Sequence, residues 1–368
     1  MPILSLLRQH SWVLVLLFAP AAVILHAVAP DRHTTVFFLS IVAIIPLAGY
    51  IGHATEQLSE RLGGGIGGLM NATFGNATEL IIGAFALHEG LYPLVKASIT
   101  GSILGNILLV FGLSALVGGI GRETQRFNRT AASMGTTMLV LSAIGLIVPG
   151  FFHHLAQNLP ESPDLQLDTE IAVVLFITYC LGLVFTLKTH RRHYGIDEGE
   201  GVGDEAPAHA PHQTPLWKPT TLLLVATAGV AIVSETLVGA VAGAAETLGM
   251  SQFFVGVVIV AIIGNAAEHY SAVVLAGRNQ MDAAISIAIG SSNQIALLVA
   301  PILVFLSYLV GPHPMDLVFS TFELVAVAVA VLSIAFIAHD GESNWMEGVQ
   351  LLAVYAILAL AFFFLPVH

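Results

Sequence analysis

Long apolar segments dominate this chain, and they restrict its fold more than any other feature. Hydrocarbon offers the backbone no hydrogen-bonding partner, so only helices and closed barrels span a membrane, and apolar segments of about 20 residues predict helices. Hydropathy in windows of about 19 residues predicts eleven membrane helices. They lie at 11–29, 34–61, 64–88, 91–119, 130–150, 168–188, 219–246, 251–277, 280–310, 316–338 and 345–366.

The composition supports an integral membrane protein. Hydrophobic residues make up 56% of the 368 residues and charged residues only 10%, whereas a soluble domain carries about 25% charged residues. The net charge of −12 argues against a nucleic-acid partner, which requires a basic surface. We therefore expect the lipid bilayer as a partner, and the acidic excess suggests a cationic ligand.

The distribution of lysine and arginine predicts the orientation. With the N-terminus inside, ten of the twelve basic residues fall on the inner side, and only Arg32 and Lys96 fall on the outer side. Positive residues accumulate on the cytosolic side of membrane proteins, so we expect a cytosolic N-terminus. The polar segment 189–218 is rich in Gly, Pro and acidic residues and is predicted to be a cytosolic linker.

Two short motifs repeat at a fixed spacing. "GNATEL" at 75–80 and "GNAAEH" at 264–269 are 189 positions apart, and the same spacing carries Gly-Ser at 101–102 onto Gly-Ser at 290–291. Two polar motifs in register indicate a duplication. Each half holds five predicted helices, an odd number, so the second half enters the membrane with opposite polarity, as in many secondary transporters.

The predicted fold is therefore an all-α membrane protein with eleven transmembrane helices, in two inverted five-helix repeats plus an extra N-terminal helix. The expected organisation is helix one in 1–33, helices two to six in 34–188, the acidic linker in 189–218, and helices seven to eleven in 219–368.

The motif glutamates, Glu79 and Glu268, fall near the middle of their segments. An ionised carboxylate at that depth costs on the order of 2.5–3.5 kcal/mol, and two such groups close together also repel each other. The pair is stable when it holds a cation or when it takes up protons. We therefore predict that both residues bind a metal cation and carry protons alternately.

Other oxygen-bearing side chains in the same helices complete a candidate cation site. Hard oxygen donors suit Ca²⁺, which takes about six to eight of them. The alternative for the serines and amides is hydrogen bonding or close packing between helices. The candidate metal ligands are Glu79, Glu268, Asn76, Asn265, Ser102, Asn106, Ser291, Ser292 and Gln294.

Four further acids are weaker candidates. Glu56 and Glu246 are expected near opposite ends of their helices, where they would attract cations at the two mouths or simply be solvated. Glu235 and Glu323 are expected deeper in the membrane, where a gating or proton-relay role is conceivable.

These residues resemble the calcium/proton antiporter (CAX) family of the cation/calcium exchanger superfamily. The resemblance rests on the two motifs, on "GSILGN", "GSSNQIAL", "FNRTAA" and "FSTFE", and covers about residues 34–338. It implies an eleven-helix fold in which Glu79 and Glu268 carry Ca²⁺ and H⁺. Thr78 and Ala267 stand where the sodium/calcium exchanger branch usually has proline, which argues against sodium as counter-ion.

The expected function is export of cytosolic Ca²⁺ in exchange for protons by alternating access. The transported ions are the expected partners, without a cofactor, and no Walker loop or HExxH motif suggests an enzyme. The alternatives are an antiporter of Na⁺, K⁺ or Mn²⁺, a passive cation channel and, with least support, an intramembrane enzyme. The chain lacks the long N-terminal extension of many eukaryotic members, which favours a bacterial plasma membrane. For the assembly, a monomer and a homo-oligomer both remain alternatives.

Overall fold

The computed structural model describes residues 15–156, 164–189 and 215–365, which are helical almost throughout. The first half contains α2 (Phe18–Val28), α3 (His33–Phe74), α4 (Ala77–His88), α5 (Tyr92–Leu104), the π-helical segment η1 (Gly105–Val110), α6 (Phe111–Gly119), strand β1 (Gln125–Arg126), α7 (Arg129–Ala156), α8 (Asp164–Val184) and the π-helical segment η2 (Phe185–Thr189).

The second half is also mostly helical. It contains α9 (Trp217–Leu248), α10 (Gln252–Phe254), the π-helical segment η4 (Val255–Val260), α11 (Ala261–Gly264), α12 (Ala266–Gly277), α13 (Met281–Gln294), the π-helical segment η5 (Ile295–Val299), α14 (Ala300–Val310), α15 (Thr321–Asp340), strand β2 (Glu342–Ser343) and α16 (Trp345–Phe364). Within the described residues, the only departure from an all-helical fold is the pair β1–β2, in which Gln125 lies opposite Ser343 and Arg126 opposite Glu342.

Among the described residues, eight helices are long and apolar enough to cross a membrane. The pair 252–264 and 266–277 counts as a ninth span if its bend of 62° is a break within one span. The first predicted helix corresponds to the shorter α2, and residues 11–14 and most of the linker, 190–214, lie outside the described residues. The prediction of a membrane protein is therefore confirmed, while the count of eleven and the inverted layout stay predictions.

The predicted segments 34–61 and 64–88 fall on α3 and α4, and α3 bends sharply between them. Ser59 Oγ donates a hydrogen bond to the Gly67 carbonyl over 2.8 Å. Eight residues of a straight helix advance about 12 Å, so the chain must fold back between these residues. The second part of α3 then leads directly into α4, and this stretch carries the first motif.

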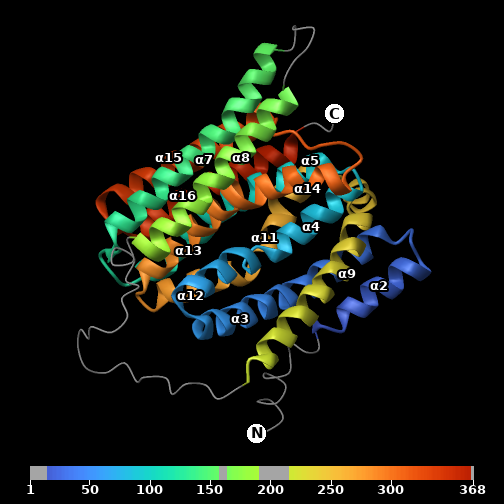
Figure 1. Ribbon diagram of the computed structural model, residues 1–368, viewed down its shortest axis with the longest axis horizontal. Coiled ribbons are helices and arrows are strands. Elements are labelled where there is room, and N and C mark those ends of the chain that lie inside the picture. Colours follow the sequence, from blue (N-terminus) through green and yellow to red (C-terminus); the bar gives the residue numbers. More distant parts are fainter. Residues whose placement is uncertain (1–14, 157–163, 190–214, 366–368) are drawn as a thin grey trace.

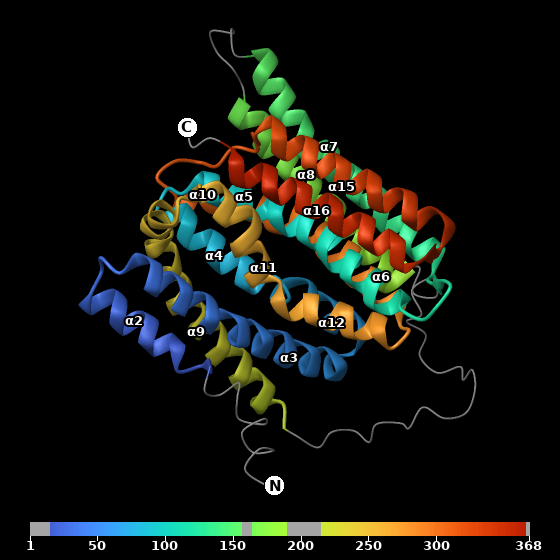
Figure 2. The ribbon, with the colours of Figure 1, turned by 180° about the vertical axis from the view of Figure 1, so that it is seen from behind.

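The helices form an arrangement of three parts (Figures 1 and 2). α2, α3 and α9 lie on one side, with α3 packed along α9, and α7, α8, α15 and α16 lie on the opposite side. α4, α11 and α12, which carry the motifs, lie between these two groups. Large apolar side chains face outward, among them Leu309, Phe336 and Phe364, which suits a surface in contact with lipid tails.

The helix boundaries preserve the spacing found in the sequence. α4 and α12 begin at Ala77 and Ala266, and α5 and α13 begin at Tyr92 and Met281, each pair 189 positions apart. η1 and η5 also end at positions separated by 189 residues. The spacing of 189 positions therefore holds for these helix boundaries as well as for the motifs.

Candidate cation-binding site

Each motif interrupts its helix at the asparagine. Asn76 (φ −103°, ψ 17°) separates α3 from α4, and Asn265 (φ −95°, ψ 8°) separates α11 from α12. Neither residue has helical dihedral angles. Each asparagine side chain donates through Nδ2 to the backbone carbonyl four residues earlier, Asn76 to Ala72 over 3.2 Å and Asn265 to Ala261 over 2.9 Å. The side chain thus satisfies a carbonyl near the break, which lowers the cost of breaking a helix inside a membrane.

The asparagines also join the two halves. Asn76 Nδ2 donates to Gln294 Oε1 over 2.5 Å, and Asn265 Nδ2 donates to Ser102 Oγ over 3.0 Å. Asn76, Asn265 and Ser102 are buried, and Gln294 is partly buried. The structure therefore brings together polar side chains that are 163 and 218 positions apart in the sequence.

The motif glycines lie beside the two glutamates. A Cβ atom on Gly264 would lie only 2.8 Å from Glu79 Oε1, and a Cβ atom on Gly75 would lie 3.5 Å from Glu268 Oε1. Each carboxylate therefore lies against the glycine of the other motif. Two ionised carboxylates held on facing motifs in this way repel each other. The contact requires a glycine at position 264, whereas a Cβ atom on Gly75 would meet Glu268 at an ordinary van der Waals distance.

The site is not symmetric in its hydrogen bonds. Ser291 Oγ donates to Glu268 Oε2, whereas Glu79 Oε2 is buried and has no partner. An acceptor without a partner in a buried position is costly, so this oxygen is the atom best placed to receive a cation or a proton. The corresponding serine of the first half, Ser102, is bonded to Asn265 instead of to Glu79.

A histidine that the sequence reasoning did not single out lies beside the site. His269 Nε2 lies 3.1 Å from Asn106 Oδ1, and Asn106 Nδ2 is buried without a partner. The sequence signal was available, because His269 directly follows Glu268 within the second motif. The equivalent positions in the other half hold Leu80 and Ile295, so this pair makes the two sides of the site chemically different.

The crossing helices contain π-helical turns where they pass the motifs. η1 follows Ser102 and includes Asn106, and η5 follows Gln294. Such turns occur frequently at functional sites. Gly101 allows close contact with η4, because a Cβ atom there would lie 2.0 Å from the Val257 carbonyl. Gly290, the equivalent position in the second half, makes no such contact, since nothing lies within 4 Å of a Cβ atom there.

The remaining candidates lie elsewhere. Ser292 Oγ donates to Ala288 of its own helix over 2.8 Å, and Glu56, Glu235 and Glu246 are exposed. Their predicted roles stay predictions.

Glu323 is buried and has contacts that account for its position without a transport role. One carboxylate oxygen accepts from Thr100 Oγ1 over 3.0 Å, and the other accepts from the Ser320 amide over 2.8 Å. Ser320 and Glu323 form a capping box at the start of α15. Glu323 therefore ties α15 to α5, and the predicted gating role stays a prediction.

The donor set suits a cation that prefers oxygen. Within the described residues, no cluster of three or more His, Cys, Asp or Glu side chains could hold a metal ion. A cation between Glu79 and Glu268 would take two carboxylates and complete its shell with amide, hydroxyl or backbone oxygens. Such a mixed oxygen shell is typical of Ca²⁺.

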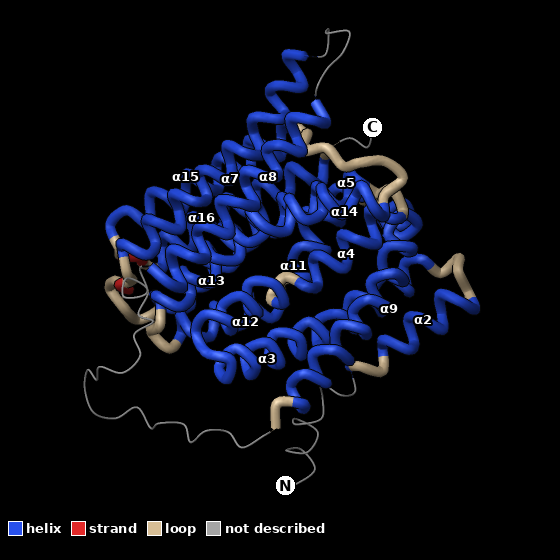
Figure 3. Tube along the Cα trace, viewed as in Figure 1, coloured by secondary structure: helices blue, strands red, loops and turns tan. Residues whose placement is uncertain are grey.

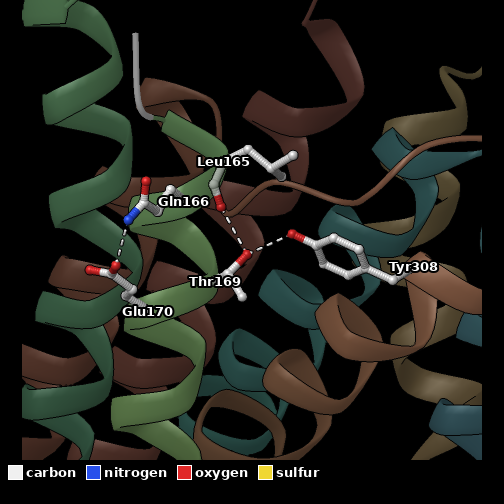
Figure 4. A pocket seen from close by; sticks show the side chains of 5 residues that line it. All are labelled: Leu165, Gln166, Thr169, Glu170 and Tyr308. Atoms are coloured by element: carbon white, nitrogen blue, oxygen red, sulfur yellow. Dashed lines mark hydrogen bonds between the residues drawn. The ribbon is translucent and has the colours of Figure 1, made fainter.

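One surface pocket is distinct from this site (Figure 4). It is lined by Leu165, Gln166, Thr169, Glu170 and Tyr308, between α8 and α14. The Thr169 and Tyr308 hydroxyls lie 2.8 Å apart, and Gln166 donates to Glu170 over 2.9 Å. Its polar groups are therefore paired with one another, and it shares no residue with the candidate site.

Comparison with known proteins shows what the chain resembles. The family model described as sodium/calcium exchanger protein matches residues 32–188 and 218–364. A protein named Ca²⁺/H⁺ antiporter from Synechocystis sp. is 45% identical over 368 residues, which cover 98% of each chain.

Solved structures agree with the sequence comparison. The structure of native YfkE has 41% sequence identity and a TM-score of 0.78, covering 95% of this chain and 100% of that chain. The crystal structure of the H⁺/Ca²⁺ exchanger CAX has 15% identity and a TM-score of 0.72, covering 97% of this chain and 92% of that chain, and it supports the fold alone. The resemblance expected from the motifs is confirmed.

Proposed function

Since the chain belongs to the sodium/calcium exchanger protein family, we propose that it is a Ca²⁺/H⁺ antiporter that exports cytosolic Ca²⁺ in exchange for protons. Relatives with this activity in their names support the assignment. The observation that carries the proposal is the reciprocal position of Glu79 and Glu268, each against the glycine of the other motif.

The exchange follows from the charge of this pair. Two ionised carboxylates at mid-depth are costly and repel each other. One Ca²⁺ between them removes both costs, and so does protonation. The empty, ionised state is therefore disfavoured, and the carrier changes orientation with either Ca²⁺ or protons bound. Loss of one cargo requires gain of the other, which couples the two fluxes.

Alternating access requires part of the structure to move relative to the site. α3 and α9 pack along each other on one side of the motif helices, and neither contains the motif glutamates. In our proposal the first part of α3, up to the bend, and α9 slide together relative to the site and open one mouth while closing the other. The distribution of basic residues supports a cytosolic N-terminus, and the bacterial relatives support a plasma-membrane location.

The alternatives differ in ion or in mechanism. Oxygen ligands distinguish poorly among Ca²⁺, Mn²⁺ and alkali cations, so another cation on the same scaffold is the second candidate. A passive channel is the third, but conduction requires weak binding and continuous passage. A buried carboxylate pair that needs neutralisation favours exchange.

The test is Ca²⁺ uptake into proteoliposomes under an imposed pH gradient. Uptake should collapse with a protonophore and be lost in Glu79→Gln and Glu268→Gln, because an amide neither carries the proton nor supplies the charge. The exposed Glu170 provides the matched control, and Glu170→Gln should transport normally. Uptake in both site variants would refute the site, and uptake driven by the Ca²⁺ gradient alone would favour a channel. Replacing Ca²⁺ by Na⁺, K⁺ or Mn²⁺ ranks the ions.

A further inference from the structure

Two loops occupy matching positions in the two halves and lie at opposite ends of the molecule. The first loop, residues 120–128, follows α6 and includes β1, and the second loop, residues 311–320, follows α14. Figure 3 shows the strand pair at one end and the long connection between α14 and α15 at the other. Neither loop carries a residue of the candidate site.

The second loop is bound to the α4–α5 hairpin of the first half. The Tyr92 hydroxyl donates to the His313 carbonyl and accepts from the His313 amide over 3.0 Å. One turn further along α5, Lys96 forms an ion pair with Asp316 and donates to the Val318 carbonyl over 2.9 Å. Two successive turns of one face of α5 therefore hold this loop.

The second loop is also packed into the protein. Met315, Leu317 and Phe319 alternate along it, and all three are buried. The Leu317 amide donates to the buried Asp168 of α8 over 3.0 Å, and the Met315 amide donates to Ser307 of α14 over 2.7 Å. The loop is thus a fixed connection among α5, α8 and α14.

The first loop is bound in the reciprocal way to the α12–α13 hairpin of the second half. Arg122 donates to the carbonyl of Gly118 near the end of α6 and to that of Gly277 at the end of α12, the latter over 3.3 Å. A cation at two helix C-termini is favourable, because both ends carry partial negative charge. Gln125 Nε2 donates to the Ala276 carbonyl over 3.3 Å, and the amide of residue 128 donates to Asp282 of α13.

Glycines make both contacts close. A Cβ atom on Gly118 would lie 2.4 Å from Gln125 Oε1 and 2.8 Å from the Ala276 carbonyl, and one on Gly311 would lie 2.7 Å from the Tyr92 hydroxyl. The two loops therefore use the same device at opposite ends of the molecule, although their side chains differ.

We infer that Lys96 and Arg122 are positioning residues for transport: each fixes a loop of one half on the hairpin of the other half that carries a motif glutamate. α4 carries Glu79 and α12 carries Glu268, so these ties hold the two carboxylates at their mutual distance. They also keep both hairpins still while other helices move. This inference rests on the proposed function and goes beyond it by naming residues outside the site.

The first test separates positioning from folding. Lys96→Met and Arg122→Met remove the charge but keep a long side chain. We expect the Ca²⁺ concentration for half-maximal uptake to rise about three- to tenfold, with a smaller change in maximal rate per folded protein. Lys96→Arg should restore uptake in part, because it restores the ion pair. Arg126, in the same first loop, pairs with Glu342 on the surface, and Arg126→Met is the matched control without effect.

The second test does not depend on these variants folding well. Cys180 is the single cysteine of the chain, so Cys180→Ser provides a cysteine-free background. Tyr92→Cys with His313→Cys can then be joined by a short thiol cross-linker, because the two rings stack at 4.1 Å. Cross-linked protein should transport like its uncross-linked parent. Transport lost on cross-linking, or unchanged half-saturation in both Met variants, would overturn the inference. Absence of Ca²⁺ uptake by the unaltered chain would instead refute the proposed function. In that case positioning is tested by comparing how much Ca²⁺ raises the melting temperature of the Met variants and of the unaltered chain.

Discussion

Substitution of Gly264 by alanine tests the reciprocal position of the glutamates directly. The added methyl would lie 2.8 Å from Glu79 Oε1 and 3.3 Å from its carboxyl carbon, whereas an ordinary contact begins near 3.4 Å. The carboxylate must therefore retreat by about 0.6 Å. Ca²⁺–oxygen distances span about 2.3–2.6 Å, so this displacement is about twice the width of the favourable range.

The expected result is weaker Ca²⁺ binding with the fold intact. Loss of one well-placed carboxylate oxygen should raise the half-saturating Ca²⁺ concentration about tenfold or more, which corresponds to about 1.4 kcal/mol or more. The assay is Ca²⁺ uptake into proteoliposomes at fixed pH gradient, normalised to the amount of folded protein. Gly290→Ala is the matched control, because it adds a methyl to a nearby helix where nothing lies within 4 Å.

The result for Gly264→Ala can refute the reasoning. Wild-type half-saturation in well-folded Gly264→Ala would show that Glu79 does not lie against this glycine in the cation-binding state. The proposed geometry of the site would then have to be abandoned.

Three further predictions concern stability in detergent, measured by thermal unfolding. Gly101→Ala should destabilise the protein by about 1–3 kcal/mol or prevent its accumulation, because the methyl would lie 2.0 Å from the backbone oxygen of Val257; normal stability would contradict this packing. Arg126→Gln should change stability by less than about 1 kcal/mol, since the Arg126 side chain is 82% exposed in its ion pair with Glu342; a larger loss would mean that this pair holds the strands together. Asn344→Ala should cost about 1 kcal/mol, because Asn344 caps α16 in a capping box with Glu347; an unchanged melting temperature would argue against the cap.

The asymmetry of the site has a consequence for the two glutamates. Ser291 already holds Glu268, while Glu79 keeps a buried oxygen without a partner. A cation that enters must therefore compete with a hydroxyl at Glu268 but not at that oxygen of Glu79. The duplicated scaffold thus gives two acids of the same kind different surroundings.

The sequence by itself determined the class of the protein and the position of its polar motifs. The length and apolarity of the segments require membrane helices. Both are local properties of consecutive residues, so the sequence alone reveals them. The spacing of 189 positions between the motifs indicated a duplication, and Glu79 and Glu268 were predicted as site residues from their charge and their predicted mid-depth. All of these conclusions need only composition, order and distance along the chain.

The tertiary structure alone decided which atoms meet. Glu79 lies against Gly264, Asn76 meets Gln294, and Glu323 serves as a helix cap. Gly101 and Gly290 are equivalent in sequence, yet only Gly101 is in close backbone contact. Such contacts depend on how helices far apart in sequence cross and rotate about their axes. Local periodicity does not encode this rotation; it is set by packing of the whole set of helices at once.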